Sequence, residues 1–346
     1  MSGGVETPRM SKEHILLGEM LGDGGQGRVY AVQRLRINGS WPVVYKQYRQ
    51  RTPVDGDVLK DMASLFSGID YDRGQWLGEH MAWPAAVVEE QGRAVGFLMR
   101  AAPEEFYIEP SFAPGTKRPA GFEFLLNSTD YIRRVIGEEP TPRQLLLLLA
   151  DLARLLAELH ELGVVVGDLS PKNVLFSFDP HPHCFLMDCD SVQFRGRTVL
   201  PQVQTPSWEV PPGETVVSEA GDAYKFGLLA IRVFAREQSG GGPADLAAID
   251  SRLGALARRS LDVRPANRPS LGEWRAALEA AATLQTAFRP STGGAARGGP
   301  RRSPVRLHSS DTPVVGPAEN GGTFGCVLLM AVVLVSLLVG LLVQAR

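Results

Sequence analysis

The chain has 346 residues, of which 44% are hydrophobic, and its formal net charge at pH 7 is −2. This length suffices for one large or two medium domains with real cores. The small net charge argues against a nucleic-acid binder that is held by bulk electrostatics. Three cysteines are too few for a disulfide framework, so we expect small buried thiols in a reducing compartment.

Strand patterns dominate the first hundred residues. The runs ILLGEMLG and GRVYAVQRLRI flank a cluster of glycines, and Asn38-Gly39 predicts a hairpin turn before WPVVYKQY. A helical pattern over Val58–Phe66 precedes two more strands, AAVVEE and AVGFLMRA, which meet at Gln91-Gly92. We therefore expect an antiparallel meander with the glycines at its first turn.

Helical patterns begin near residue 128. The run TPRQLLLLLADLARLLAELHELG has Thr141 as its cap, Pro142 at the first helical position and Gly163 as its stop. Further helices are expected over Asp222–Arg236, Ala244–Ser260 and Leu271–Leu284. The sequence therefore predicts a small β-rich lobe followed by a larger helical lobe.

The C-terminal sixty residues have a different composition. Residues 286–323 are rich in Pro, Gly and Arg, and they predict a flexible linker. Residues 324–343, FGCVLLMAVVLVSLLVGLLV, carry no charge. At about 1.5 Å per residue they span about 30 Å, the thickness of a bilayer's hydrocarbon core. They predict one transmembrane helix at the C-terminus, and the arginines upstream favour a cytoplasmic location for the rest of the chain. No signal-peptide pattern precedes the first strand.

The glycine cluster lies between two strands. Gly22, Gly24 and Gly27 are followed by Val29, and a dinucleotide-binding fold would need a helix at that point. Seventeen residues beyond Val29, the strand VVYK ends in Lys46. A lysine there is in reach of the α- and β-phosphates of a nucleotide under the glycine turn.

Two later stretches carry oxygen-bearing side chains at suggestive spacings. In VVVGDLSPKNVLF, Asp168 and Asn173 are five residues apart, with Pro171 between them. This spacing suits a loop in which the aspartate faces a substrate hydroxyl and the asparagine carbonyl faces a metal ion. In CFLMDCDSVQF, an apolar strand ends at Asp188, a second oxygen ligand for Mg²⁺ between nucleotide phosphates.

This ordered set of motifs resembles the eukaryotic-like serine/threonine protein kinase family, in a divergent bacterial form. The resemblance covers roughly residues 13–285. Three later motifs extend it, of which the first, TPSWEVPP, is similar to the end of an activation segment. Asp222 in GDAYKFG matches a buried aspartate at a helix start, and Arg268 in RPANRPS matches the arginine that braces the large lobe.

The resemblance implies an α+β, bilobal kinase-like fold with an N-lobe of about residues 13–101 and a C-lobe of about 102–285. It implies ATP and Mg²⁺ as cofactors, and protein substrates and a cognate phosphatase as partners, with no nucleic acid. It also implies roles for four side chains: Lys46 on the α/β-phosphates, Asn173 and Asp188 on Mg²⁺, and Asp168 on a Ser/Thr hydroxyl.

The chain departs from the family pattern at several positions. Val166 and Gly167 replace the usual histidine and arginine, so no guanidinium there can pair a phosphate on the activation segment. Ser170 replaces a lysine, whose charge Lys172 is conjectured to supply. The remaining departures are Asp188-Cys189-Asp190, which lacks the glycine hinge, and the partner acid of Lys46, for which Asp57 and Asp61 are candidates.

Two alternatives to a protein kinase remain open. A pseudokinase would keep the fold as a nucleotide-binding signalling scaffold and lose phosphate transfer. A small-molecule phosphotransferase is the second, because GDLSPKN and MDCD also resemble aminoglycoside-type kinases. The complete glycine pattern, the activation-segment remnant and Arg268 argue against the second alternative.

Overall fold

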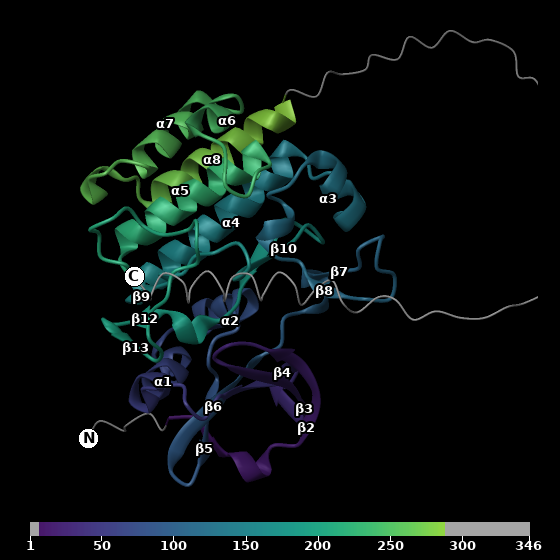
Figure 1. The fold of residues 1–346 in the computed structure, drawn as a ribbon, viewed down its shortest axis with the longest axis vertical. Helices are drawn as coiled ribbons and strands as arrows, with labels where there is room; N and C mark the ends of the chain where they lie inside the picture. Colours follow the sequence, from purple (N-terminus) through teal and green to yellow (C-terminus); the bar gives the residue numbers. More distant parts are fainter. Residues whose placement is uncertain (1–6, 288–346) are drawn as a thin grey trace, which may run out of the picture. The chain divides into compact units, whose positions relative to one another are not determined.

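A computed structural model of the chain describes residues 7–287, which lie within one compact unit. Within this unit a β-sheet occupies one end and a body of α-helices the other (Figure 1). The hydrophobic core is continuous between the two lobes, because Val44 and Phe97 of the sheet belong to the same buried cluster as Leu148 and Phe226 of the helices.

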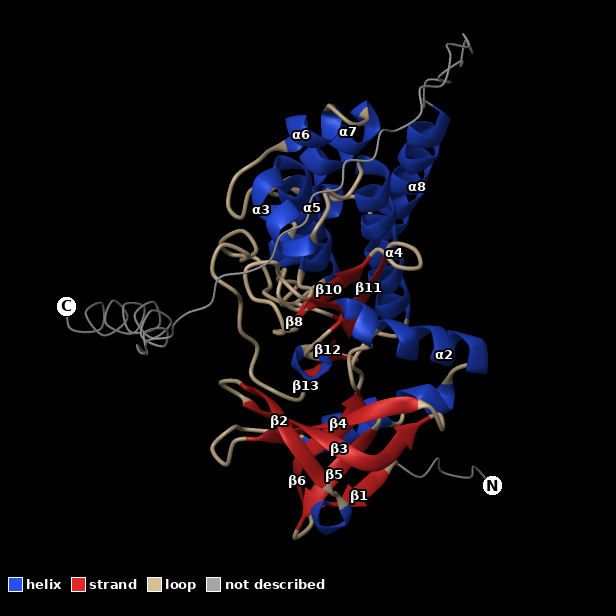
Figure 2. Cartoon of the chain, turned by 90° about the vertical axis from the view of Figure 1, so that its right-hand side faces the viewer, coloured by secondary structure: helices blue, strands red, loops and turns tan. Residues whose placement is uncertain are grey.

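The sheet of the N-lobe has six strands in the order β1-β5-β6-β4-β3-β2 (Figure 2). The strands are β1 Arg9–Ser11, β2 Leu17–Asp23, β3 Gly27–Ile37, β4 Trp41–Tyr48, β5 Ala86–Glu90 and β6 Arg93–Arg100. Strand β1 pairs in parallel with β5, and the other neighbours are antiparallel. The sheet is therefore mixed, and the expected antiparallel meander lacked β1, whose three residues are too few to show a period-two pattern.

Both predicted hairpin turns are present. Asn38 and Gly39 have φ of 50° and 71°, and Gln91 and Gly92 have φ of 52° and 77°. Positive φ at both central residues is typical of the type I′ turns that join adjacent antiparallel strands. The sequence located these turns because few residues adopt that conformation without strain.

Two helices complete the N-lobe: α1 Gly56–Ala63 and α2 Tyr71–His80. The side chain of Asp55 caps α1, which ends three residues before the predicted limit and continues into a 3₁₀ turn, Leu65–Gly68. Helix α2 was not predicted, because its buried residues, Leu77, Gly78 and His80, cover only one turn and its amphipathic periodicity is weak.

The C-lobe is built on α4 and α8, which pack along one another (Figure 1). Its helices are α3 Thr129–Ile136, α4 Pro142–Glu161, α5 Glu219–Ala235, α6 Pro243–Ala247, α7 Ser251–Ser260 and α8 Leu271–Ala287. The predicted capping of α4 by Thr141 is confirmed. The prediction of a single helix over residues 244–260 is wrong. This stretch forms two helices, α6 and α7, because the Asp250 side chain caps α7 and a new helix begins there.

Short strands lie between the sheet and the helical body (Figure 2). They are β7 Tyr107–Ile108, β8 Arg118–Pro119, β9 Val164–Val165, β10 Val174–Ser177, β11 His183–Leu186, β12 Gln193–Phe194 and β13 Arg197–Thr198. Strand β11 also contacts the N-lobe, because the Ala82 N–H donates to the Leu186 carbonyl over 2.9 Å. The loop after β11 therefore begins near the junction of the lobes. The loop after β9 ends beside it, because the Met187 N–H donates to the main-chain carbonyl of Asn173.

The predicted fold class needs correction. It included a C-terminal transmembrane helix, but among residues 7–287 no helix combines the length and apolar character needed to cross a bilayer. Helix α4 is long enough, yet it is amphipathic, with Asp151 and Glu158 among its leucines. The segment 324–343 and linker residues 288–323 lie outside the described residues. What the structure describes is an α+β fold with a mixed sheet and eight α-helices in residues 7–287.

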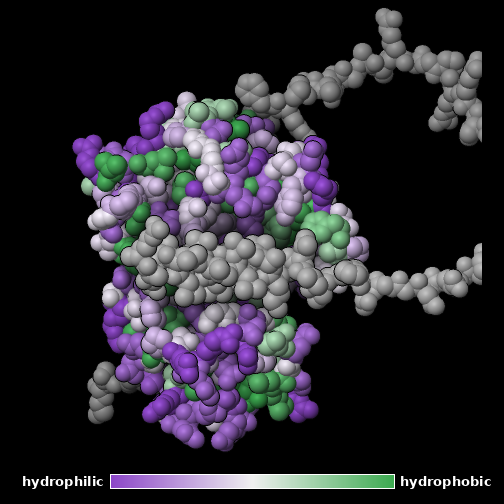
Figure 3. Space-filling model, in the orientation of Figure 1, coloured by the Kyte–Doolittle hydropathy of each residue, from purple (hydrophilic) through white to green (hydrophobic). Residues whose placement is uncertain are grey.

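The face of the molecule seen in Figure 3 is mostly hydrophilic over the β-rich lobe. Hydrophobic side chains gather in smaller patches, several of them over the helical lobe. Scattered exposed apolar residues are normal on a folded domain.

Candidate active site

The glycine motif forms the hairpin between β2 and β3. Gly22 lies opposite Val29, and the Gly24 N–H donates to the Gly27 carbonyl over 2.9 Å. A Cβ atom on Gly27 would lie 2.5 Å from the Gln47 carbonyl oxygen, so packing within the chain requires glycine there. Added Cβ atoms on Gly22 and Gly25 would meet nothing within 4 Å. Packing among the described residues therefore gives no reason for glycine at those two positions.

Lys46 lies on β4 directly opposite Val29, so the hairpin and the lysine are neighbours in the sheet. Its side chain is buried, and its Nζ lies 3.1 Å from Asp188 Oδ1 and 2.6 Å from Asp190 Oδ1. Burial works to lower the pKa of Lys46, but the two carboxylates outweigh burial and raise it. Lys46 is therefore a charged group held in a fixed position.

Asp190 is the site residue that sequence reasoning missed as a partner of Lys46. Asp188 has the left-handed conformation, with φ of 51°, and a 3₁₀ turn, Cys189–Ser191, follows it. The N–H and hydroxyl of Ser191 both donate to the Asp188 carbonyl, over 3.0 and 2.7 Å. This tight turn brings the fully buried Asp190 carboxylate back to Lys46, and burial raises the pKa of that carboxyl.

The two helix acids proposed as partners of Lys46 bind elsewhere. Asp57 pairs with Lys60 over 3.3 Å, and Asp61 pairs with Arg197 of β13 over 3.3 Å. Both pairs are largely exposed. The acid that orients Lys46 therefore comes from the loop after β11, and the sequence signal for it was the second aspartate of Asp188-Cys189-Asp190.

Asp168 faces a hydroxyl group of the chain itself. The Thr205 hydroxyl lies 2.9 and 3.0 Å from the two carboxylate oxygens of Asp168, and the Thr205 N–H donates to Oδ1 over 3.1 Å. Asn173 donates from Nδ2 to the Asp168 main-chain oxygen over 3.0 Å. The half-buried carboxylate is thus oriented toward the Thr205 hydroxyl.

The loop that carries Asp168 is fixed from below by α5. The fully buried Asp222 accepts hydrogen bonds of 2.8 Å from the N–H groups of Val166 and Gly167, and His160 Nε2 lies 2.9 Å from it. Val166 and Gly167, two of the positions that depart from the kinase pattern, are therefore held through their main-chain N–H groups, which need no particular side chain.

A buried ion pair braces the helical lobe nearby. Arg268 contacts Glu214 with both ends of its guanidinium, and the exposed fractions of the two side chains are 1% and 11%. Sequence reasoning found Arg268 but missed Glu214. Glu214 lies two positions beyond the end of the expected motif TPSWEVPP, with Gly213 between them, so the motif did not include it.

Asn173 and Asp188 suit a Mg²⁺ ion bound with phosphates. The Met187 N–H donates to the main-chain carbonyl of Asn173 over 2.8 Å. Asn173 therefore lies beside the residue that precedes Asp188. The Asp188 side chain is 51% exposed, and only its Oδ1 contacts Lys46. Within residues 7–287 no cluster of three or more His, Cys, Asp or Glu side chains could hold a metal ion. Two hard oxygen ligands fit an ion whose other ligands are phosphates and water.

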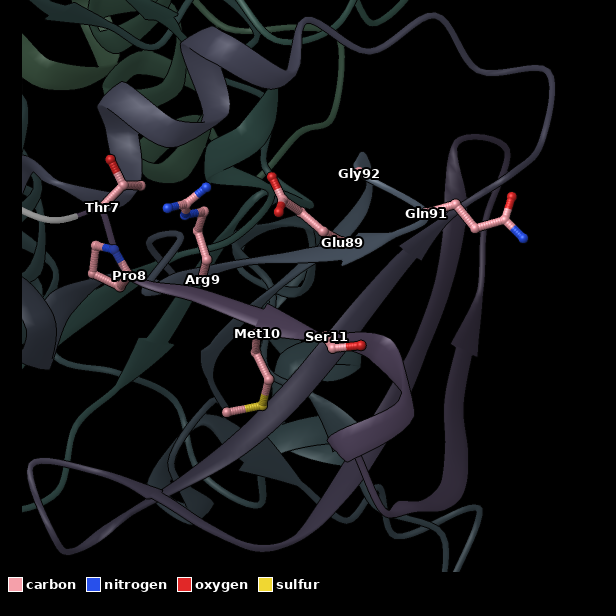
Figure 4. A pocket seen from close by; sticks show the side chains of 8 residues that line it. All are labelled: Thr7, Pro8, Arg9, Met10, Ser11, Glu89, Gln91 and Gly92. Atoms are coloured by element: carbon pink, nitrogen blue, oxygen red, sulfur yellow. The ribbon is translucent and has the colours of Figure 1, made fainter.

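A separate hollow of about 610 Å³ follows β1 and the end of β5 (Figure 4). In Figure 4 the side chains of Arg9 and Glu89 rise on the same side of the strands, while Gln91 points away from them. Strands β1 and β2 are opposite edges of the sheet, and none of the residues that line this hollow belongs to the glycine hairpin.

Comparison of the chain with protein-family models finds no match, and comparison with curated proteins finds none. The function is therefore inferred from the motifs and from the geometry of the site.

Proposed function

We propose that this protein is an ATP- and Mg²⁺-dependent protein kinase that transfers the γ-phosphate of ATP to serine or threonine hydroxyls. The observation that supports this proposal most is the buried ion pair of Lys46 with the aspartates after β11. A charged, immobilised lysine beside a glycine hairpin is suited to hold phosphates.

The nucleotide would lie against the hairpin of β2 and β3. Gly22 and Gly25 leave open space where a side chain would otherwise project, which allows a close approach of phosphate oxygens. Lys46 binds the α- and β-phosphates as a point charge, and Asp190 keeps it oriented. Mg²⁺ held by Asn173 and Asp188 would supply neutralisation of the phosphate charge.

Asp168 acts on the acceptor. It accepts a hydrogen bond from the substrate hydroxyl and orients the oxygen toward the γ-phosphorus. A bond forms between that oxygen and the γ-phosphorus, and the bond to the β–γ bridging oxygen breaks, which releases ADP. The hydroxyl proton passes to the Asp168 carboxylate. Positioning and charge neutralisation supply most of the rate enhancement in this reaction.

A nucleotide-binding scaffold without transfer is the second candidate. The observation in its favour is that Thr205 of the chain already occupies both carboxylate oxygens of Asp168. An incoming hydroxyl must share or displace this contact. In this case the Lys46 ion pair would serve nucleotide binding alone.

Full-length protein incubated with Mg²⁺ and γ-labelled ATP tests the proposal. We expect label on Ser or Thr of the chain itself or of a generic protein acceptor, and none in Lys46→Met. Nucleotide binding without any incorporation would favour the scaffold. Efficient transfer to an aminoglycoside, with none to protein, would assign the chain to the small-molecule phosphotransferases.

A further inference from the structure

Lys225 is a second buried lysine, and the proposed mechanism does not use it. It lies on α5 with none of its surface exposed, and its Nζ donates to the Gly167 carbonyl over 2.7 Å. Lysine is almost never fully buried unless its charge is partnered. Among residues 7–287 only Lys46 shares this burial with it.

Lys225 and Asp222 together hold the residue before Asp168. They lie three positions apart on α5, a spacing that places two side chains on the same helix face. Asp222 accepts the Gly167 N–H over 2.8 Å, and Lys225 donates to the Gly167 carbonyl. Both main-chain polar groups of Gly167 are thus fixed by α5. The Gly167 carbonyl belongs to the peptide unit that joins Gly167 to Asp168.

The conformation of Gly167 fits this arrangement. Its φ is 71°, and a Cβ atom there would lie 3.1 Å from a Val217 methyl group and 3.2 Å from the Gln202 amide oxygen. A larger side chain would be strained at this φ and crowded by both neighbours. The loop is therefore fixed at position 167 by hydrogen bonds to its main chain, and no side chain is needed there.

The charge of Lys225 also acts on Asp168. Burial lowers the pKa of Lys225, and the carboxylate of Asp168 is the strongest of the charges that oppose this effect. Lys172, by contrast, is exposed, and its charge acts on Glu123. The Lys225 ammonium on α5 and the Asp168 carboxylate therefore attract one another.

We propose that Lys225 is a positioning residue for phosphoryl transfer: it fixes the Gly167–Asp168 peptide, and its positive charge attracts the Asp168 carboxylate. The proposal rests on the proposed function and assigns part of its machinery. It also implies that the catalytic loop is set by α5, with no need of a phosphate on the activation segment.

The test compares full-length Lys225→Met, Lys172→Met and Lys117→Met; Lys117 is an exposed lysine paired with Glu104 and serves as the matched control. Lys225→Met should lower kcat by about tenfold to a hundredfold, with KM for ATP within about threefold, because misplacement affects the chemical step. Amide hydrogen exchange over residues 164–170 should become faster in Lys225→Met alone. Lys117→Met should match wild type in both measurements.

An unchanged kcat in Lys225→Met, or a loss confined to Lys172→Met, would overturn the proposal. A rise in KM for ATP without a fall in kcat would also overturn it, since that would assign Lys225 to nucleotide binding. If the wild-type chain transfers no phosphate, the proposed function fails, and hydrogen exchange still decides whether Lys225 fixes the loop: unchanged protection would refute it. Should Lys225→Met not fold, Lys225→Gln provides the same comparison.

Discussion

Lys46 and Lys225 are both buried, one in each lobe, and their surroundings differ. Lys46 has two carboxylates within 3.1 Å, and these raise its pKa against the effect of burial. Lys225 has a main-chain carbonyl as its hydrogen-bond acceptor, and burial lowers its pKa. Close ion pairing offsets the desolvation of a buried ammonium, whereas a carbonyl dipole and more distant charges do so only in part.

This difference separates two halves of the candidate site. The nucleotide half, around Lys46, is organised by charge, and neutralising any member should affect it strongly. The half that carries Asp168 is organised by two hydrogen bonds at Gly167: its N–H donates to Asp222, and its carbonyl accepts from Lys225. This half should respond to changes of geometry. Helix α1 contributes to neither half, since its acids bind Lys60 and Arg197.

The largest effect is expected for Lys46→Met. This change leaves Asp190 buried without its cation, and removal of one partner of a buried ion pair costs about 3–5 kcal/mol in the free energy of unfolding. Urea denaturation of the full-length chain measures it. The control Lys60→Met breaks the pairs of a partly exposed lysine with Asp57 and Glu89 and should cost less than about 1 kcal/mol. Equal stability of Lys46→Met and wild type would show that the pair is not formed in solution.

The next effect distinguishes Asp190 from the acids of α1. Asp190→Asn removes the nearer carboxylate of Lys46, and we expect Kd for ATP to rise about tenfold, or about 1.4 kcal/mol. Asp57→Asn and Asp61→Asn alter exposed pairs, so their Kd values should stay within about twofold of wild type. Calorimetric titration with Mg²⁺-ATP measures all three. A loss of affinity in Asp61→Asn alone would return the role to α1.

A smaller effect concerns the activation segment. Alanine at Thr198, Thr205 and Ser207 together should change kcat by less than about tenfold, or 1.4 kcal/mol. Gly167 offers no guanidinium to a phosphate, and the hydrogen bond from Thr205 to Asp168 is worth about 1 kcal/mol. Steady-state kinetics of the triple variant measures the change. A several-hundredfold loss would mean that another basic residue binds a phosphorylated segment.

The smallest effect concerns the start of α1. The N–H of Val58, with a contribution from Arg197, lowers the pKa of Asp55 below 3.8. A lowered pKa gives stability that is present above 3.8 and is lost as the pH falls through the folded-state pKa. Asp55→Ala should cost about 1 kcal/mol at pH 7, and less as the pH falls below 3.8. Urea denaturation at both ends of this range tests it, and Asp55→Asn, which keeps a capping oxygen, should cost less. If wild type and Asp55→Ala differed in unfolding free energy by the same amount at low pH, the ionised carboxylate would not be the source of the capping stability.

The sequence predicted the elements with strong local patterns. Helix α4 has a capping box and a long apolar face, and the turn at Asn38-Gly39 requires positive φ, so both were found. Strand β1 and helix α2 escaped prediction, because each depends on packing partners more than on its own pattern. Tertiary context decided these elements, as it often does for short ones.

The candidate site divides in the same way. Linear motifs named Lys46, Asp168, Asn173 and Asp188 as candidate site residues, because their spacings along the chain are informative. The supporting contacts were not predictable: Asp190 lies 144 positions from Lys46, and Lys225 lies 58 positions from Gly167. Such pairs are defined only when the chain folds. No single-sequence pattern relates residues at those separations.

Phosphate incorporation by Asp168→Asn tests the central claim most directly. Full-length wild type and this variant are compared with Mg²⁺ and γ-labelled ATP, with ATP affinity measured in parallel. We expect wild type to incorporate label and the variant to lose at least about a hundredfold in incorporation, because it lacks the base that accepts the hydroxyl proton. The Kd for ATP should stay within about threefold, because Lys46 and Asp190 are intact. Equal incorporation by both proteins would contradict the assignment of Asp168 as the residue that orients the acceptor.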